Sequence, residues 1–289
     1  MATSPTEIRK LDFVGIGVQK SASTWLFECL LKHPDIRGPV GNIKKELNFF
    51  NKNYAKGYAW YHKRFEFGPW KTGEYSVSYF RDNSVPERIY RYNPNVKLLL
   101  SLRNPIDRAL SQHYHQVRRN RLPKKLYGFW DALEQNPTYI EQGKYVSLLK
   151  RYLEFFDHSQ IFIVLFDDIC SEPIVVLRNL FSFLGVNSTF QPSLVGDKTN
   201  VAHMHRSLML HRFIETTSRG VRHFLGESFL EALKATKIPT LIRRYNEIEI
   251  DERTVPPLSE DERKRLHDVF SEENERLGIL IGRDLSHWK

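Results

Sequence analysis

The sequence predicts an α/β protein in which helices cover both faces of a central parallel β-sheet. Four short apolar runs are typical of buried parallel strands, and they cover residues 11–18, 71–75, 96–102 and 161–166. Helical patterns alternate with these runs, and such alternation implies a parallel sheet between two helical layers. The first run leads through a turn rich in Lys, Ser and Thr directly into a helix. Together these features predict a P-loop-like architecture.

The predicted helices begin and end at residues that commonly bound helices. They cover residues 23–32, 105–119, 145–156, 173–184 and 259–277. Pro105 suits a first helical turn, and Gly185 suits the position just after a helix. Ser259, followed three residues later by Glu262, has the spacing of a capping box.

We expect one domain that spans residues 1–289. Residues 1–10 form a polar tail, and residues 186–257 are less regular, with several proline and glycine residues. This stretch predicts an irregular cap on the substrate side, with one helix near residues 207–219. The chain shows no internal repeat or low-complexity tract.

Composition indicates a basic protein with an anionic ligand. Lys and Arg number 43 against 34 Asp and Glu, for a formal net charge of +9. Only two cysteines occur, and they do not have the spacing of metal ligands. So small a number excludes a disulfide framework and favours a reducing compartment. No apolar stretch approaches the ~20 residues that span a bilayer, and the N-terminus does not resemble a signal peptide. We therefore expect a cytoplasmic protein without an integral membrane segment.

The turn after the first strand is the main candidate site. It contains Lys20, Ser21, Ser23 and Thr24 at the start of a helix. Free N–H groups of a first helical turn, an ammonium group and short hydroxyls suit phosphate or sulfate oxygens. The turn differs from G-x-x-x-x-G-K-[ST], because Lys20 stands where the second glycine would be. This difference argues against a magnesium-dependent kinase, which remains the nearest alternative enzyme.

A second candidate anion site follows the third predicted strand. Arg103 stands at its carboxyl end, and Ser111 lies about two turns into the next helix. A guanidinium group suits two phosphate oxygens, and a hydroxyl adds a further bond. The alternative is an Arg103 that pairs with Asp107 or caps the strand end. Two anion subsites on strand ends suit a ligand with phosphates at both ends.

Several stretches resemble sulfotransferases that use 3′-phosphoadenosine 5′-phosphosulfate (PAPS), in particular a bacterial type related to the carbohydrate branch. The stretches occur in the same order and cover residues 19–25, 45–50, 73–79, 103–111 and 282–288. The resemblance implies PAPS as donor and adenosine 3′,5′-bisphosphate (PAP) as product.

The resemblance also implies a role for each residue of the two anion sites. The 5′-phosphosulfate would be held by Lys20, Ser21, Ala22, Ser23 and Thr24. Arg103 and Ser111 would hold the 3′-phosphate. Trp25 would stack on the adenine or pack in the core. Lys198 is a candidate for a late cofactor loop, with a solvated lysine as the alternative.

The family reaction is an in-line sulfuryl transfer to a hydroxyl or, less often, an amine. Lys20 would stabilise negative charge on the leaving oxygen. Glu46 matches the general base of the glycan-modifying branch, and its alternative is a surface ion pair with Lys44 or Lys45. His113 and His115 are the other candidates for the base. We expect no metal, because a sulfuryl group carries less negative charge than a phosphoryl group.

Departures from the heparan-type pattern shape the expected acceptor. Asn48, Asn51 and Tyr75 replace residues that contact acidic glycan in heparan-type members of the family. We therefore expect a small metabolite, a lipid or a glycoside as acceptor and no nucleic acid partner. A catalytically inactive nucleotide-binding module is the non-enzymatic alternative.

Overall fold

The computed structural model describes residues 9–41, 45–193, 255 and 257–288, and the backbone of residues 203–205 and 247–249. The chain divides into two compact units. The first unit comprises Met1–Arg108, Ile140–Asp197 and Lys264–Lys289, and the second comprises Ala109–Tyr139 and Lys198–Arg263. The prediction of one domain over residues 1–289 stays a prediction.

The first unit contains a parallel sheet of five strands in the order β2-β3-β1-β4-β5. The strands are β1 (Phe13–Gly17), β2 (Ile36–Arg37), β3 (Lys71–Tyr75), β4 (Lys97–Leu102) and β5 (Ile161–Leu165). Each strand pairs in parallel with its neighbours. The four predicted strands and the parallel sheet are thereby confirmed. The edge strand β2 was not predicted, because two residues carry no periodic signal.

Helices cover both faces of this sheet, as the fold class requires. The helices of this unit include α1 (Ser23–Lys32), α2 (Gly57–His62), α3 (Val85–Tyr92), α7 (Tyr145–Leu153), α8 (Phe166–Ser171), α9 (Pro173–Leu184) and most of α12 (Glu260–Ile281). The first unit also contains three short 3-10 helices, η1 (Tyr54–Lys56), η2 (Tyr79–Arg81) and η4 (His158–Gln160).

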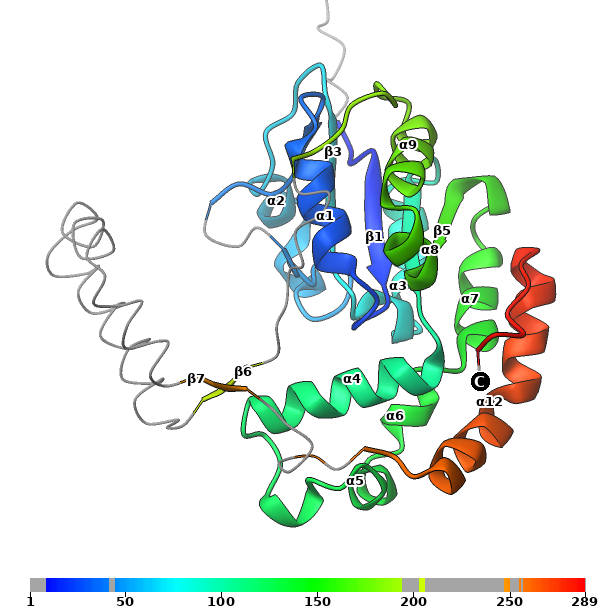
Figure 1. The fold of residues 1–289 in the computed structure, drawn as a ribbon. Coiled ribbons are helices and arrows are strands. Elements are labelled where there is room, and N and C mark those ends of the chain that lie inside the picture. Colours follow the sequence, from blue (N-terminus) through cyan, green and yellow to red (C-terminus); the bar gives the residue numbers. More distant parts are fainter. Residues whose placement is uncertain are drawn as a thin grey trace, which may run out of the picture. The chain divides into compact units, whose positions relative to one another are not determined.

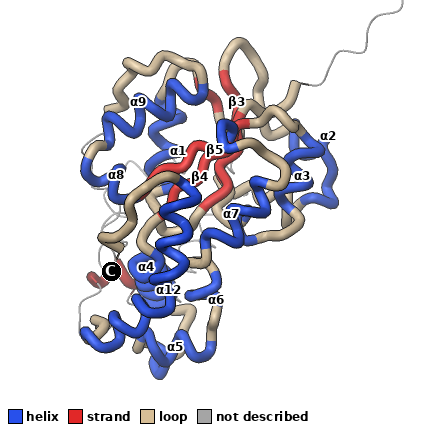
Figure 2. The backbone as a smooth tube through the Cα atoms, turned by 90° about the vertical axis from the view of Figure 1, so that its right-hand side faces the viewer, coloured by secondary structure: helices blue, strands red, loops and turns tan. Residues whose placement is uncertain are grey.

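Alternate residues of β1 point into two different cores. Val14 and Ile16 pack with residues of α2, α3 and α7, whereas Phe13 packs with residues of α1, α8 and α9. Figure 1 shows α1, α8 and α9 over the near face of the sheet. In Figure 2 the strands lie between this layer and a second layer with α3 and α7. A strand buried on both faces is apolar at every position, which explains the continuous apolar run in the sequence.

The second unit is described by its helical part and one strand pair. Its elements are α4 (Pro105–Arg118), which begins in the first unit, η3 (Lys124–Leu126), α5 (Phe129–Gln135), the start of α6 (Thr138–Glu141), and the antiparallel pair β6 (His203–His205) and β7 (Glu247–Glu249). The predicted helix near residues 207–219 and most of the predicted cap lie outside the described residues.

The last helix, α12 (Glu260–Ile281), begins directly after its predicted N-cap residue, Ser259. Ser259 N–H donates to a Glu262 carboxylate oxygen at 2.8 Å, and Glu262 N–H donates to Ser259 Oγ at 3.3 Å. This reciprocal pair is the capping box that the sequence predicts.

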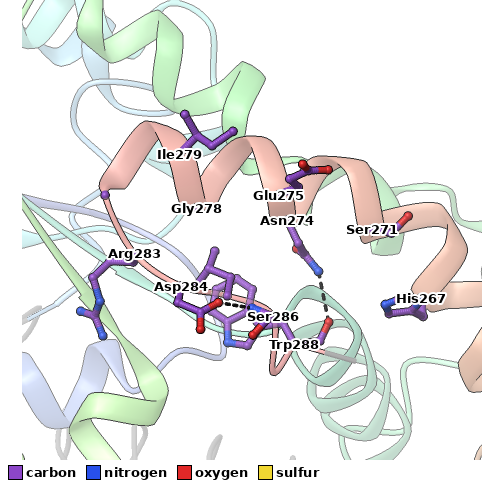
Figure 3. Close-up of a pocket in the computed structure, with 12 residues that line it drawn as sticks. His267, Ser271, Asn274, Glu275, Gly278, Ile279, Arg283, Asp284, Ser286 and Trp288 are labelled. Carbon is purple, nitrogen blue, oxygen red and sulfur yellow. Dashed lines mark hydrogen bonds between the residues drawn. The ribbon is translucent and has the colours of Figure 1, made fainter.

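The segment after α12 is anchored to α8. Arg283 forms a bidentate ion pair with Asp168, in which its two terminal guanidinium nitrogens donate to the two carboxylate oxygens at 2.8 and 2.9 Å. Trp288 Nε1 donates to the Asp167 carboxylate at 2.7 Å. A pocket of about 560 Å³ lies between α12 and this segment (Figure 3). The buried side chain of Asn274 lies beside it and donates to the Trp288 carbonyl at 3.4 Å. Neither candidate anion turn contributes a lining residue, so this pocket is separate from the predicted site.

Candidate active site

The turn between β1 and α1 has a backbone shaped for an anion. Lys20 and Ala22 have left-handed φ angles of 70° and 59° and alternate with Ser21 and Ser23, which lie outside that region. Such alternation turns successive N–H groups toward one concave side, the arrangement known as a nest. Because left-handed backbone is costly for residues with a Cβ, its presence twice in three residues indicates a functional turn.

The glycines before this turn are needed by the packing of β1. A Cβ on Gly15 would lie 2.2 Å from the ring of Tyr75, and one on Gly17 would lie 2.7 Å from Cβ of Phe80. Tyr75 and Phe80 therefore pack directly against the β1 backbone. This packing fixes the end of β1, from which the turn at residues 20–24 begins.

The hydroxyls of this turn lie in three different environments. Ser21 is fully buried, and its Oγ has no hydrogen-bond partner among the described residues. The Oγ atoms of Ser23 and Thr24 accept hydrogen bonds from Nζ of Lys45 at 3.1 and 3.0 Å. A buried hydroxyl without a partner costs free energy, so Ser21 indicates a site that a ligand completes.

Arg103 lies against the same turn. Its Nη1 donates to the carbonyl of Lys20 at 3.3 Å, and its guanidinium carbon lies 4.3 Å from the ring centroid of Phe166. Tyr145 holds the Arg103 backbone through a hydrogen bond from its hydroxyl to the Arg103 carbonyl at 2.9 Å. The buried Nε of Arg103 has no partner among the described residues. The structure thus brings two residues that are far apart in the sequence into one site.

Glu46 lies on the other side of the turn, next to the end of β3. Its N–H donates to the Tyr75 carbonyl at 3.0 Å, and its carboxylate accepts from Val77 N–H at 3.2 and 3.3 Å. The side chain is 37% exposed, and Lys45 Nζ lies 3.9 Å from one carboxylate oxygen. Burial raises the pKa of Glu46, while Lys45 lowers it in part. The carboxylate is therefore accessible and more basic than an ordinary glutamate.

The backbone around Glu46 is held in an unusual conformation. Glu46 and Asn48 both have left-handed φ angles, of 60° and 50°. Ser76 Oγ accepts from Asn48 N–H at 3.0 Å and donates to the buried carboxyl of Glu74 at 2.7 Å. Tyr79 accepts from Phe50 N–H at 3.2 Å and donates to the same carboxyl at 2.7 Å. Glu74 therefore fixes the segment that carries Glu46 through two hydroxyl groups.

The strand order explains why these groups meet. Strands β3, β1 and β4 are neighbours in the sheet and run parallel, so their carboxyl ends lie on the same side of the sheet. Glu46 lies at the end of β3, Lys20 follows β1, and Arg103 follows β4. The anion turn therefore lies between the candidate base and the candidate 3′-phosphate residue. In parallel sheets, ligands bind at the carboxyl ends of the strands.

The other predicted site residues have different surroundings. Trp25 is half-buried and packs on the core of α1, α8 and α9, and Ser111 is half-buried on α4 in the second unit. Their assigned contacts with the cofactor stay predictions. Lys198 lies outside the described residues.

The two candidate histidines also belong to the second unit. His113 is fully buried, its Nε2 lies 2.8 Å from the Tyr127 carbonyl, and burial lowers its pKa. This is the environment of a packing histidine. His115 is half-buried, and its Nδ1 lies 3.2 Å from Arg118.

Sequence reasoning did not assign roles to Lys45 and Glu74. The sequence suggests Lys45 only as a surface partner of Glu46, whereas its ammonium group also contacts the anion turn. Glu74 lies in a matched stretch, and the signal for its role was a charged residue inside an otherwise buried strand. Such a residue is expected to be hydrogen-bonded, and the three hydroxyls of Tyr61, Ser76 and Tyr79 donate to it.

A small cavity adjoins the Glu46 side of the turn. It has a volume of about 40 Å³, and its lining includes Gln19, Val77 and Arg81. Val77 is the residue whose N–H holds the Glu46 carboxylate. Glu46 itself does not line the cavity. Among the described residues, no three His, Cys, Asp or Glu side chains are grouped as metal ligands.

This fold defines an α/β protein with a parallel sheet, and its candidate anion turn follows β1 at the carboxyl ends of the strands, next to the Glu46 carboxylate. Comparison with known proteins gives the family. Residues 10–223 match the sulfotransferase domain. The chain belongs to the sulfotransferase family, which confirms the predicted family.

Individual relatives share part of the chain. Heparan sulfate glucosamine 3-O-sulfotransferase 5 of Mus musculus is 33% identical over 184 residues, which cover 59% of this chain and 52% of that protein. Bifunctional heparan sulfate N-deacetylase/N-sulfotransferase 1 of Mus musculus is 31% identical over 192 residues, which cover 60% of this chain and 22% of that protein. The chain thus spans about half or less of these relatives.

A solved structure with the same fold supports the fold class. The sulfotransferase from Alicyclobacillus acidocaldarius superposes with a TM-score of 0.66 at 24% identity, covering 97% of this chain and 99% of that one. At this identity the likeness concerns the fold alone.

Proposed function

We propose that this chain transfers a sulfuryl group from PAPS to an acceptor hydroxyl, with Glu46 as general base. When bound, PAPS supplies a sulfuryl group on an activated phosphosulfate, and PAP is the product. The observation that carries the proposal is the position of the Lys20 turn between Glu46 and Arg103, at the ends of three adjacent strands. In this order the 3′-phosphate of PAPS would lie at Arg103 and its 5′-phosphosulfate at the Lys20 turn. The acceptor would lie beyond the phosphosulfate, at Glu46.

The residues of the anion turn fit the 5′ end of the donor. Lys20 supplies a full positive charge, and Ser21, Ser23 and Thr24 supply hydroxyl donors beside the free N–H groups of α1. Lys20 also stabilises the charge that accumulates as the bond to the sulfuryl group breaks. Arg103 and Ser111 would hold the 3′-phosphate, and Trp25 would stack on the adenine. Nothing in these roles requires a metal ion.

Glu46 has the properties of a general base. Its carboxylate is exposed enough to reach an acceptor, and burial raises its pKa toward the range in which proton abstraction is efficient. Val77 N–H fixes its orientation from the β3 side. An acceptor hydroxyl within hydrogen-bond distance of the Glu46 carboxylate would lose its proton to it.

We propose a small metabolite, a lipid or a glycoside as acceptor. The names of several relatives refer to heparan sulfate. Asn48 and Asn51 are occupied with hydrogen bonds to Ser78 at 2.5 and 3.0 Å, and Tyr75 is fully buried. None of the three offers the positive charge that an acidic glycan requires.

The cytoplasm remains the proposed compartment. Cys29 is buried, Cys170 is exposed, and neither forms a disulfide. Among the described residues, no helix has the length and apolar character needed to cross a membrane.

Transfer of label from radiolabelled PAPS to a panel of alcohols, glycosides and lipid hydroxyls tests the proposal. Heparan sulfate and an amine serve as comparison acceptors. We expect labelled ester on at least one uncharged hydroxyl acceptor and none on heparan sulfate. Label transfer confined to heparan sulfate would overturn the acceptor class, and transfer to none despite PAP binding would favour an inactive nucleotide-binding module.

A further inference from the structure

Lys45 is the described residue that connects the anion turn with Glu46. Its Nζ donates to Ser23 Oγ at 3.1 Å and to Thr24 Oγ1 at 3.0 Å, and it lies 3.9 Å from a Glu46 carboxylate oxygen. The ring centroid of Tyr75 lies 5.3 Å from the same ammonium nitrogen. The side chain is 20% exposed. Its charge is therefore held at one place between the two halves of the site.

The surroundings of this ammonium group compensate its charge only in part. Burial lowers the pKa of Lys45, and the carboxylates of Glu46 and Glu28 oppose that effect as the smaller contributions. The two groups within hydrogen-bond distance are neutral hydroxyls, and Glu46 lies beyond that distance. A desolvated cation is stabilised most by an anion in direct contact.

The direction of the two hydrogen bonds also matters. An ammonium group has only donors, so Ser23 and Thr24 accept from it with an oxygen lone pair. The proton of each hydroxyl is then left to donate elsewhere. Lys45 therefore orients both hydroxyls as donors, which is the role an anion in the Lys20 turn requires.

We propose that Lys45 is a second cation of the phosphosulfate site, which binds the 5′ anion of the donor together with Lys20 and orients Ser23 and Thr24 toward it. This inference rests on the proposed function. It adds a specificity residue for the 5′ end of the nucleotide, and it couples that end to the base through the Lys45–Glu46 pair.

Binding measurements with two nucleotides separate this role from a general structural one. PAP carries a 5′-phosphate, whereas adenosine 3′-monophosphate does not. The variant is Lys45→Met, which keeps most of the side-chain length, and the control is Lys52→Met, which removes an exposed charge from the same segment. Titration calorimetry gives the four affinities, and thermal unfolding shows that each variant is folded. Lys45→Gln replaces Lys45→Met if the latter does not fold.

We expect Lys45→Met to weaken PAP binding by about 10- to 150-fold, the range for a lost hydrogen bond to a charged group. Binding of adenosine 3′-monophosphate should change by less than about twofold. Lys52→Met should leave both affinities close to those of the wild type.

The outcomes distinguish this inference from the proposed function. Equal losses for both nucleotides, or no loss for PAP, would overturn the role of Lys45 while PAP binding by the wild type still supports the proposed function. Wild-type protein that binds PAP no better than adenosine 3′-monophosphate would overturn both.

Discussion

The guanidinium group of Arg103 donates a hydrogen bond to the backbone carbonyl of Lys20 at 3.3 Å. This contact joins the turn after β4 to the turn after β1, across two strands that pair in parallel. Lys20 and Arg103, which are proposed for the two anionic ends of one nucleotide, therefore lie in contact within the first unit. The contact also fixes the Lys20 turn from the side opposite Glu46.

Arg103→Ala should weaken PAP binding by about 1.5–3 kcal/mol, because a charged hydrogen bond to the 3′-phosphate is lost. Binding of adenosine 5′-monophosphate, which does not carry that phosphate, should change much less. Titration calorimetry with both nucleotides measures the difference, and Arg178→Ala, an exposed arginine on α9, is the control. Equal weakening of the two nucleotides would show that Arg103 only supports the turn.

Ser21→Ala should separate binding from stability. The buried Oγ has no partner among the described residues, so its removal should leave the unfolding temperature unchanged or raise it slightly. PAP binding should weaken by about 1.5–3 kcal/mol if this hydroxyl donates to a charged oxygen. Calorimetric scans and titrations on the same preparation give both quantities. A variant that unfolds at lower temperature and binds PAP normally would contradict this role.

Glu46→Gln should leave PAP affinity intact and lower kcat by about 10²- to 10⁴-fold, the contribution of a general base. The wild-type kcat/KM should rise with pH through a pKa above the ordinary glutamate value, since burial raises the pKa of Glu46 and only the ionised form abstracts a proton. Initial rates with an acceptor from the screen measure both effects, with Glu87→Gln on α3 as control. Normal turnover by Glu46→Gln would move the role of base to a histidine.

Glu74 should make stability depend on pH. Burial raises its pKa from 4.5 to about 7, although Ser76, Tyr79 and Tyr61 donate hydrogen bonds to it. Between these values the unfolded carboxyl group is ionised while the folded one is protonated. The folded state thus binds more protons, so the contribution of Glu74 to the free energy of unfolding falls as pH rises from 4.5 to 7.

Glu74→Gln should remove this dependence. The difference in unfolding free energy between wild type and variant should change by up to about 3 kcal/mol between pH 4.5 and 7. Urea unfolding at several pH values measures it, and the exposed Glu66→Gln should give a flat difference. A flat difference for Glu74→Gln would show that this carboxyl group is ionised in the folded protein.

Much of the fold follows from local signals in the sequence. The helices at residues 23–32 and 173–184 begin and end as predicted, because Pro34 and Gly185 stop them. The strand β2 depends on pairing with β3 and has no local pattern of its own. The same contrast holds for the site.

The residues that sequence reasoning assigned are those with recognisable chemistry next to a strand end. Lys45 could not be assigned in this way, since its contacts with Ser23 and Thr24 exist only because β3 pairs beside β1. Glu74 acts through hydroxyls of Ser76 and Tyr79, and such a network depends on tertiary packing. These positions required the three-dimensional structure.

Titration of the wild-type protein with PAP, and separately with ATP and magnesium, tests the central claim most directly. The turns at Lys20 and Arg103 are proposed to hold one adenosine bisphosphate. We predict tight binding of PAP in metal-free buffer and much weaker binding of ATP. ATP binding with magnesium that equals or exceeds PAP binding would contradict the account and favour a kinase.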